Sequence, residues 1–126
     1  MKTIILIDDD DLGVYLNSMI LKEALGTVEI VHYPSVEAAL EYFLGPDYSH
    51  PNLILLDINL PAMDAWDFLQ ELEQRQVAIG ELPLVLLSSH ISPRDEEKIA
   101  QYGMEGAVMI KPLQMEILAE LGILRH

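Results

Sequence analysis

The stretch from residue 53 to residue 69 reads LILLDINLPAMDAWDFL, and it places an aspartate, Asp57, directly after four apolar residues. Residues 53–57 form a short run that is apolar up to its last position, as is typical of a strand covered on both faces of a sheet. From Asp64 onward, apolar residues recur three and four positions apart, which indicates an amphipathic helix. The stretch therefore predicts a buried strand that ends in a carboxylate and is followed by a helix.

Short apolar runs alternate with amphipathic segments along the whole chain. This alternation predicts a parallel sheet with right-handed crossovers and with helices on both faces. A chain of 126 residues is too short for an eight-stranded barrel, which needs about 200 residues or more. The predicted fold class is therefore α/β, an open, doubly wound, five-stranded parallel sheet. The predicted strands are residues 3–7, 28–32, 53–57, 84–88 and 107–110, and the predicted helices begin near residues 12, 36, 64, 93 and 113.

Capping residues support the helix assignments. Asp10 or Asp11 is expected to cap the first helix, and Gly26 is expected to end it. Ser92 followed by Pro93 predicts the start of the fourth helix, since proline favours the first helical position. The apolar residues expected on the first helix are Leu12, Leu16, Met19 and Ile20, and those on the fifth are Met115, Leu118 and Leu121.

The composition excludes several classes of function. The chain has 21 acidic and only 7 basic residues, a formal net charge of -14. Such a surface repels nucleic acid and anionic membranes and favours metal cations or a basic partner, although it can also serve solubility alone. The absence of cysteine excludes disulfides, thiolate metal sites and cysteine nucleophiles, and it suits a reducing cytoplasm. No apolar run is long enough to span a bilayer, so we expect one cytoplasmic domain over residues 1–126.

Aspartates stand at the carboxyl ends of two predicted strands, the edge at which doubly wound sheets bind ligands. If the first and third strands are neighbours, Asp8, Asp9 and Asp57 converge on one crevice. Two carboxylates about 4 Å apart repel each other by about 4 kcal/mol at an effective dielectric constant of about 20. Mg²⁺ relieves such repulsion because it prefers oxygen ligands, and it keeps some of its waters for a phosphate oxygen to replace. The residues therefore predict a Mg²⁺ site.

Two further strand ends add chemistry for a phosphoryl group. Lys111 can neutralise Asp57 and later pair with a phosphate oxygen, and Ser88 offers a hydroxyl donor. Asp57 itself can act as a nucleophile that forms an acyl phosphate. A single aspartate at a strand end is usually only a turn or cap residue. The prediction therefore rests on the conjunction of four strand ends that each supply one part of one site.

With these residues in place, the chain resembles the receiver domain of two-component response regulators over essentially its whole length. The matching stretches are ILIDDDD, LILLDINLPAMDAWDFL, LPLVLLSS and KPL. The resemblance implies a flavodoxin-like fold with strand order 2-1-3-4-5 and assigns six residues to one site. These are Asp57 as the phosphoacceptor, Asp8 and Asp9 as the acidic pair for Mg²⁺, Asn59 as a metal ligand through its backbone carbonyl, Ser88 as the hydroxyl that reports phosphorylation, and Lys111 as the lysine of the site.

The resemblance also implies how such a chain works. The phosphoryl group comes from a phosphohistidine on a sensor histidine kinase or a histidine phosphotransfer protein, or from a small donor such as acetyl phosphate. The domain is not a classical enzyme, but it catalyses its own phosphorylation and dephosphorylation, and it signals or relays phosphate through contact with a downstream protein target. Asn59 and His90 are expected to flank the path of the attacking water, and the Lys111–Pro112 peptide bond is expected to be cis.

The chain departs from the family pattern in three places. Ala65 stands where the family has a glycine, so the turn into the third helix must avoid a positive φ or tolerate alanine there. The aromatic residue that the family commonly has in its fifth strand is replaced by Val108 or Ala107, so we expect the response to use a loop shift and not a ring flip. The chain ends soon after Pro112, so no output domain is expected, and it is either a stand-alone receiver or a piece of a longer protein.

Three alternatives remain open. A Mg²⁺-dependent phosphatase of the haloacid dehalogenase type also phosphorylates an aspartate, but it carries a second aspartate where this chain has Asn59. A flavodoxin-like binding module needs a phosphate-binding loop where this chain has four aspartates. A degenerate receiver that no longer takes up phosphate and acts only as a docking module is the third.

Overall fold

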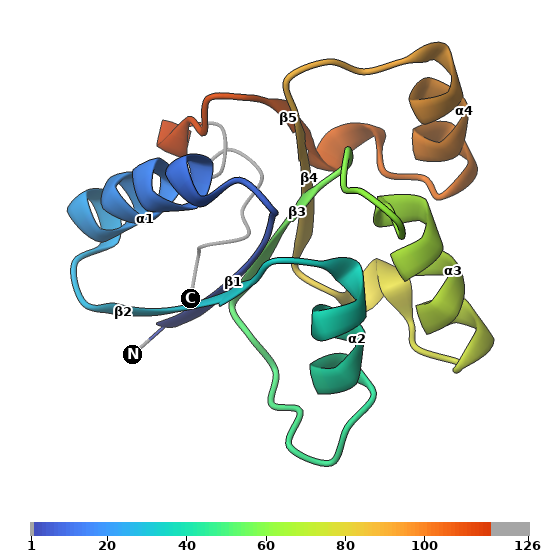
Figure 1. Ribbon diagram of the computed structural model, residues 1–126, viewed down its shortest axis with the longest axis horizontal. Helices are drawn as coiled ribbons and strands as arrows, with labels where there is room; N and C mark the ends of the chain where they lie inside the picture. The colour runs from blue at the N-terminus through green and yellow to red at the C-terminus, as the bar shows by residue number, and fades with distance from the viewer. Residues whose placement is uncertain (1, 117–126) are drawn as a thin grey trace.

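The computed structural model describes residues 2–116, and its centre is a five-stranded parallel sheet in the order β2-β1-β3-β4-β5. Figure 1 shows the strands stacked through the middle of the molecule with helices around them. The strands are β1 (Lys2–Ile7), β2 (Val28–Tyr33), β3 (Leu53–Asp57), β4 (Leu84–Ser88) and β5 (Val108–Ile110). The helices are α1 (Asp11–Leu25), α2 (Val36–Phe43), α3 (Ala65–Gln74) and α4 (Pro93–Gln101), with short 3₁₀ turns η1 (Ile79–Glu81) and η2 (Glu105–Ala107).

The predicted boundaries agree with these elements to within one or two residues. The fifth strand, for example, begins one residue later than predicted, at Val108, because Ala107 belongs to the turn η2 that leads into it. The fifth helix was expected to carry Met115, Leu118 and Leu121. Of these, Leu118 and Leu121 lie outside the described residues.

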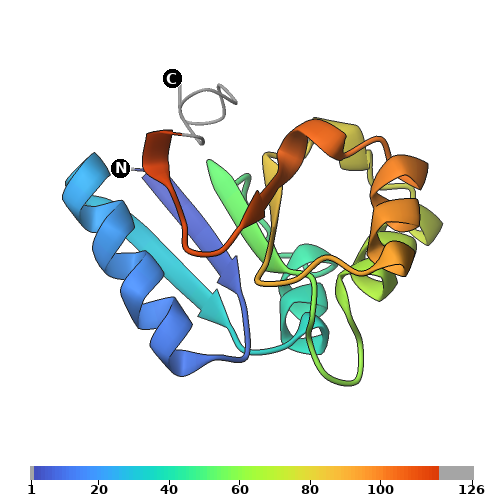
Figure 2. The ribbon, with the colours of Figure 1, turned by 90° about the horizontal axis from the view of Figure 1, so that it is seen from above.

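Two apolar layers cover the two faces of the sheet. Successive residues of a strand point to opposite faces, so Ile5 and Ile7 of β1 pack with α2, α3 and α4, while Ile4 and Leu6 pack with α1. Figure 2 shows the same division, with α1 on one side of the sheet and α3 and α4 on the other. The strands are therefore apolar at every position because both of their faces are covered.

The first helix packs through a different stripe from the one predicted. Its inward face carries Val14, Asn17 and Leu21, three and four positions apart, and Asn17 and Leu21 are buried. Leu12, Leu16 and Met19 are instead exposed, and of the four predicted apolar residues only Ile20 packs against the core. The apolar periodicity identified the helix correctly, but it did not give its rotation about its own axis.

Side-chain caps begin the helices that lead away from the carboxyl edge of the sheet. Asp10 caps α1 by accepting a hydrogen bond from the backbone N–H of Leu12, so of the two predicted candidates Asp10 is the cap. Asp64 caps α3 within a reciprocal capping box, and the positive φ of this connection falls on Ala62 (62°), while Ala65 is already helical. The Lys111–Pro112 bond is cis, as predicted. Within residues 2–116, no helix is long and apolar enough to cross a membrane.

Candidate metal centre

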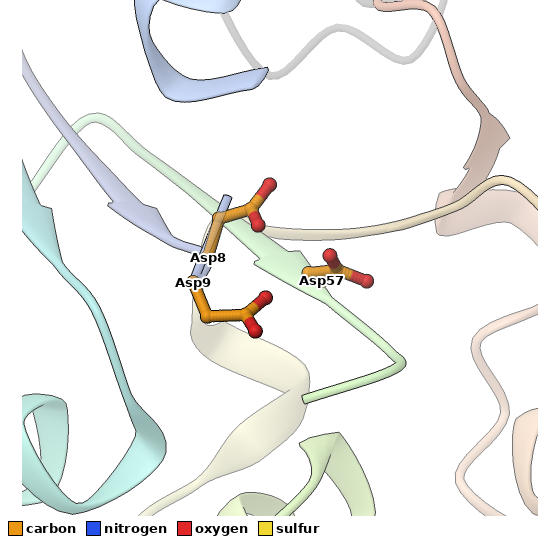
Figure 3. Close-up of side chains that lie close together, drawn as sticks. All are labelled: Asp8, Asp9 and Asp57. Atoms are coloured by element: carbon orange, nitrogen blue, oxygen red, sulfur yellow. The ribbon is translucent and has the colours of Figure 1, made fainter. Parts of the chain in front are cut away.

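Parallel pairing brings three aspartates together at the carboxyl edge of the sheet. β1 and β3 are neighbours, with Ile7 opposite Leu56, so the residues that follow them meet in space. Asp8, Asp9 and Asp57 each offer a carboxylate oxygen within 4.8 Å of the others. Figure 3 shows the carboxylates of Asp8 and Asp9 directed toward the side on which Asp57 lies. Asp8 and Asp57 are buried and Asp9 is exposed, so the cluster opens to solvent on one side.

Lys111 supplies the positive charge of this cluster. Its Nζ donates to Oδ2 of Asp57 at 2.9 Å and to Oδ2 of Asp8 at 3.3 Å. Burial acts to lower the pKa of Lys111, but the hydrogen bond and charge of Asp57 outweigh it and raise that pKa above its ordinary value. The ammonium group is therefore firmly charged, yet it balances only one of three carboxylates.

The negative charge that Lys111 does not balance affects the pKa of Asp8. Burial raises its pKa, the negative charge of Asp57 raises it further, and together they outweigh the hydrogen bonds from Asp10 and Lys111. A carboxylate with a raised pKa is one whose ionised form is poorly stabilised by its surroundings. The cluster therefore favours any cation that could enter it, and its all-oxygen donor set suits a hard cation such as Mg²⁺.

Ser88 lies at the end of β4 and is fully buried. Its Oγ donates to the backbone carbonyl of His90 and accepts from the backbone N–H of His90 at 3.0 Å. It also accepts a hydrogen bond from the side-chain amide of Asn59 at 2.9 Å. Among the described residues no hydrogen bond joins Ser88 to Asp57, so the hydroxyl is engaged by the loop that follows β4.

Asn59 has a side-chain role that the sequence did not reveal. Its backbone N–H donates to Oδ1 of Asp57 at 2.9 Å, and its side-chain amide bridges to Ser88. From its position in the sequence, Asn59 was expected to bind the metal through its backbone carbonyl and to lie beside the path of the attacking water. The exposed ring of His90 makes no hydrogen bond within the described residues, and its backbone holds Ser88 instead.

A second feature near the site was also missed. A cleft of about 540 Å³ opens beside Asp9 and Asn59 and is lined on its far side by the first residues of α3 and α4. There the buried Trp66 donates a hydrogen bond to the buried Asp95, and the exposed Arg94 pairs with Asp64. The spacing of Ser92 and Asp95 is a capping-box signal that could have marked Asp95 as structural. Its contact with Trp66 has no sequence signal.

Comparisons with known proteins agree with this fold. The model of a family described as the response regulator receiver domain matches residues 4–121. The aerobic respiration control sensor protein ArcB of Escherichia coli (strain K12) is 30% identical over 118 residues, which is 94% of this chain and 14% of that protein. The chain thus spans about one seventh of the length of the curated relatives it matches.

Solved structures show the same architecture. A two-component response regulator from Legionella pneumophila superposes with a TM-score of 0.80 at 24% identity, covering 97% of this chain and 95% of that one. One from Cytophaga hutchinsonii has a TM-score of 0.72 at 28% identity and covers 100% and 98%. The Mn²⁺-bound form of response regulator Rcp1 has a TM-score of 0.75 at 24% identity and covers 96% and 89%. The predicted fold class and strand order are therefore confirmed.

Proposed function

We propose a phosphoacceptor function from one premise: this chain belongs to the family of response regulator receiver domains of two-component systems. Asp57 accepts a phosphoryl group from a phosphohistidine donor, with Mg²⁺ as cofactor. The observation that carries the proposal is the placement of Asp57, a buried carboxylate bound by Lys111 within 4.8 Å of two further carboxylates. A buried carboxylate that shares its one ammonium partner with a second carboxylate gains from a ligand of compensating positive charge, and its oxygen can act as the nucleophile in phosphoryl transfer.

The donor set fits Mg²⁺ on chemical grounds. Asp8, Asp9 and Asp57 would hold the ion together with the backbone carbonyl of Asn59, and water or phosphoryl oxygens would complete its coordination. When bound, Mg²⁺ would neutralise the excess negative charge and that of the incoming phosphoryl group. The structurally similar response regulator Rcp1 has an Mn²⁺-bound form, which supports a divalent cation as the cofactor of this chain.

The transfer itself asks little of the protein beyond positioning and charge. One carboxylate oxygen of Asp57 attacks the phosphorus, the P–N bond of the phosphohistidine breaks, and its electron pair stays on the imidazole nitrogen. Lys111 then moves its hydrogen bond from Asp57 to a phosphoryl oxygen, which keeps the ion pair while the acceptor changes. Hydrolysis reverses the state when water attacks the phosphorus and the bond to Asp57 breaks.

Ser88 links this chemistry to the loop that follows β4. To donate to a phosphoryl oxygen, its hydroxyl must give up the carbonyl of His90. A hydroxyl has one proton to donate, so it cannot serve both acceptors at once. Phosphorylation therefore competes directly with the resting contact of that loop.

The partners follow from the same proposal. The phosphodonor is a sensor histidine kinase or a histidine phosphotransfer protein, and the similarity to ArcB, a sensor protein by name, supports that class. The output is contact with a downstream protein target, with no nucleic acid and no membrane bound, as the net charge of -14 favours. We place residues 1–126 in one cytoplasmic receiver domain.

The test is phosphoryl uptake from acetyl phosphate with Mg²⁺, followed by intact-protein mass. The native chain should gain one phosphoryl group, and the Asp57→Asn protein should gain none. Asp47→Asn, which changes an exposed aspartate in a loop away from the cluster, is the matched control and should behave like the native chain. Equal uptake by Asp57→Asn would refute the acceptor, and steady turnover of p-nitrophenyl phosphate would favour the phosphatase alternative.

A further inference from the structure

Helices α3 and α4 are joined beside the site by a bond between two buried side chains. Nε1 of Trp66 donates to Oδ1 of Asp95 at 3.0 Å, and the two residues are only 3% and 5% exposed. Because neither group can turn to water, breaking this bond would leave a buried donor and a buried carboxylate unsatisfied. This single hydrogen bond therefore contributes to holding α3 and α4 together.

Asp95 also fixes the start of α4. Its Oδ2 accepts from the backbone N–H of Ser92 at 3.1 Å, while its own N–H donates to Oγ of Ser92 at 3.1 Å, which forms a capping box. One carboxylate thus connects the end of the β4–α4 loop to α3. Burial acts to raise the pKa of Asp95, but the hydrogen bonds from Trp66 and Ser92 outweigh it and lower that pKa, so the group stays ionised at neutral pH.

The same indole contacts α4 at its other end. The ring of Tyr102, the C-terminal cap of α4, stacks on Trp66 with centroids 6.2 Å apart and planes at 10°. Asp95 and Tyr102 are seven positions apart, which places them on one face of the helix two turns from each other. Trp66 therefore contacts α4 near its first turn and at its C-terminal cap.

The opposite end of the β4–α4 loop is held in another way. The hydroxyl of Ser88 donates to the carbonyl of His90 and accepts from its N–H, and it also accepts from the side-chain amide of the exposed Asn59. This contact lies next to Asp57, and under the proposed function it is the one that a phosphoryl group displaces. Residues 89–91 thus lie between a contact that phosphorylation breaks and the Ser92–Asp95 capping box, which it does not reach.

We propose that Trp66 and Asp95 are positioning residues that keep α4 fixed on α3, so that phosphorylation of Asp57 rearranges only residues 89–91. The inference rests on the proposed function. It gives this chain a route for its response that needs no aromatic residue at Val108. The changed surface is then the mouth of the cleft beside Asn59 and Arg94.

The experiment is amide exchange with Mg²⁺, with and without beryllofluoride, which mimics a phosphoryl group on aspartate. In the native chain, loss of the hydrogen bond from Ser88 Oγ to the carbonyl of His90 should loosen the loop. The amide of His90, which donates to the same Oγ, should then exchange about fivefold faster with beryllofluoride. The amides of residues 97–101 should change by less than about twofold. In Trp66→Phe, which keeps an aromatic ring beside Tyr102 but loses the donor, the amides of residues 97–101 should respond by about fivefold or more.

Arg94→Ala is the matched control, because it removes an exposed ion pair between the same two helices and should leave α4 unresponsive. Asp95→Ala, which removes both acceptor oxygens, should act like Trp66→Phe. The inference would be wrong, with the proposed function untouched, if the amides of α4 respond to beryllofluoride in the native chain as strongly as the amide of His90. It would also be wrong if the exchange of these amides does not change in either Trp66→Phe or Asp95→Ala. A native chain without any response to beryllofluoride would instead overturn the proposed function and the inference with it.

Discussion

Two buried carboxylates near the same edge of the sheet have opposite environments. Asp8 shares one ammonium group with Asp57 and has a raised pKa because burial and the neighbouring charge oppose its ionised form. Asp95 makes none of the ion pairs found among the described residues, yet hydrogen bonds from Trp66 and Ser92 lower its pKa. Neutral donors and a helix N-terminus satisfy the hydrogen-bonding capacity of Asp95, whereas the cluster of Asp8 keeps an excess of negative charge.

The difference separates a carboxylate that holds the structure from carboxylates that are available for chemistry. A satisfied group such as Asp95 gains nothing from a cation or a phosphoryl group. The cluster of Asp8, Asp9 and Asp57 gains from a cation, because each additional positive charge reduces a repulsion that the fold itself creates. Burial alone therefore does not mark a carboxylate as a candidate for function, and burial without enough donors is the better criterion.

The largest expected effect comes from removing the one cation of the cluster. Lys111→Met keeps the length of the side chain but leaves three carboxylates without a counter-charge. In metal-free buffer we expect the free energy of unfolding, measured with urea, to fall by about 3 kcal/mol, because the remaining buried charges become uncompensated. Saturating Mg²⁺ should then stabilise the variant more than it stabilises the native chain.

Asp47→Asn, which alters an exposed charge elsewhere, serves as the control for Lys111→Met and should change neither value measurably. The proposed excess of negative charge in the cluster would be wrong if Lys111→Met is as stable as the native chain without metal. It would also be wrong if Mg²⁺ stabilises both proteins equally, since the excess charge of the cluster would then have no effect on the free energy of unfolding.

A smaller loss should follow from removing the donor of the satisfied carboxylate. Trp66→Phe deprives Asp95 of a buried hydrogen bond, and hydrogen bonds to charged groups are worth about 2 kcal/mol. We expect a decrease of that size in the free energy of unfolding, with and without Mg²⁺ alike, because Asp95 is not part of the cluster. Arg94→Ala should cost less than about 1 kcal/mol, since its side chain is 60% exposed. A loss that Mg²⁺ restores would show that the two regions are not separate.

The sequence predicted the unsatisfied cluster much better than the satisfied bond. Asp8 and Asp57 follow apolar strands, and parallel pairing of neighbouring strands is enough to bring their ends together. Trp66 and Asp95 are 29 positions apart on two different helices, and their contact depends on how each helix is rotated against the sheet. Periodicity does not fix that rotation to the required precision, as the exposed Leu16 of α1 also demonstrates.

The contacts around Ser88 could not be predicted from the sequence for a related reason. Its bonds to His90 and Asn59 depend on the path of a short irregular loop, and hydroxyl partners in loops leave no repeating pattern in a sequence. The sequence could name Ser88 as a donor near the site, but only the structure shows which acceptor it uses. The meeting of Asp8, Asp9 and Asp57 at one edge of the sheet was therefore predictable, and the resting hydrogen bonds around Ser88 were not.

The smallest effect is a difference in pH dependence between the two carboxylates. Asp95 has a folded pKa below its ordinary value of 3.8, so its ionised form contributes stability that is present above that value and is lost as the pH falls through the lower folded pKa. The stability of the native chain relative to Asp95→Asn should thus be constant near neutral pH and should decrease in acid. Asp8 has the opposite sign, because its pKa is raised above 3.8. In metal-free buffer, the stability of the native chain relative to Asp8→Asn should be greatest in acid and should decrease as the pH rises through the folded pKa. Urea unfolding of the three proteins across acid to neutral pH measures both slopes, and two slopes of the same sign would mean that the environments of Asp8 and Asp95 do not differ in the way the hydrogen bonds indicate.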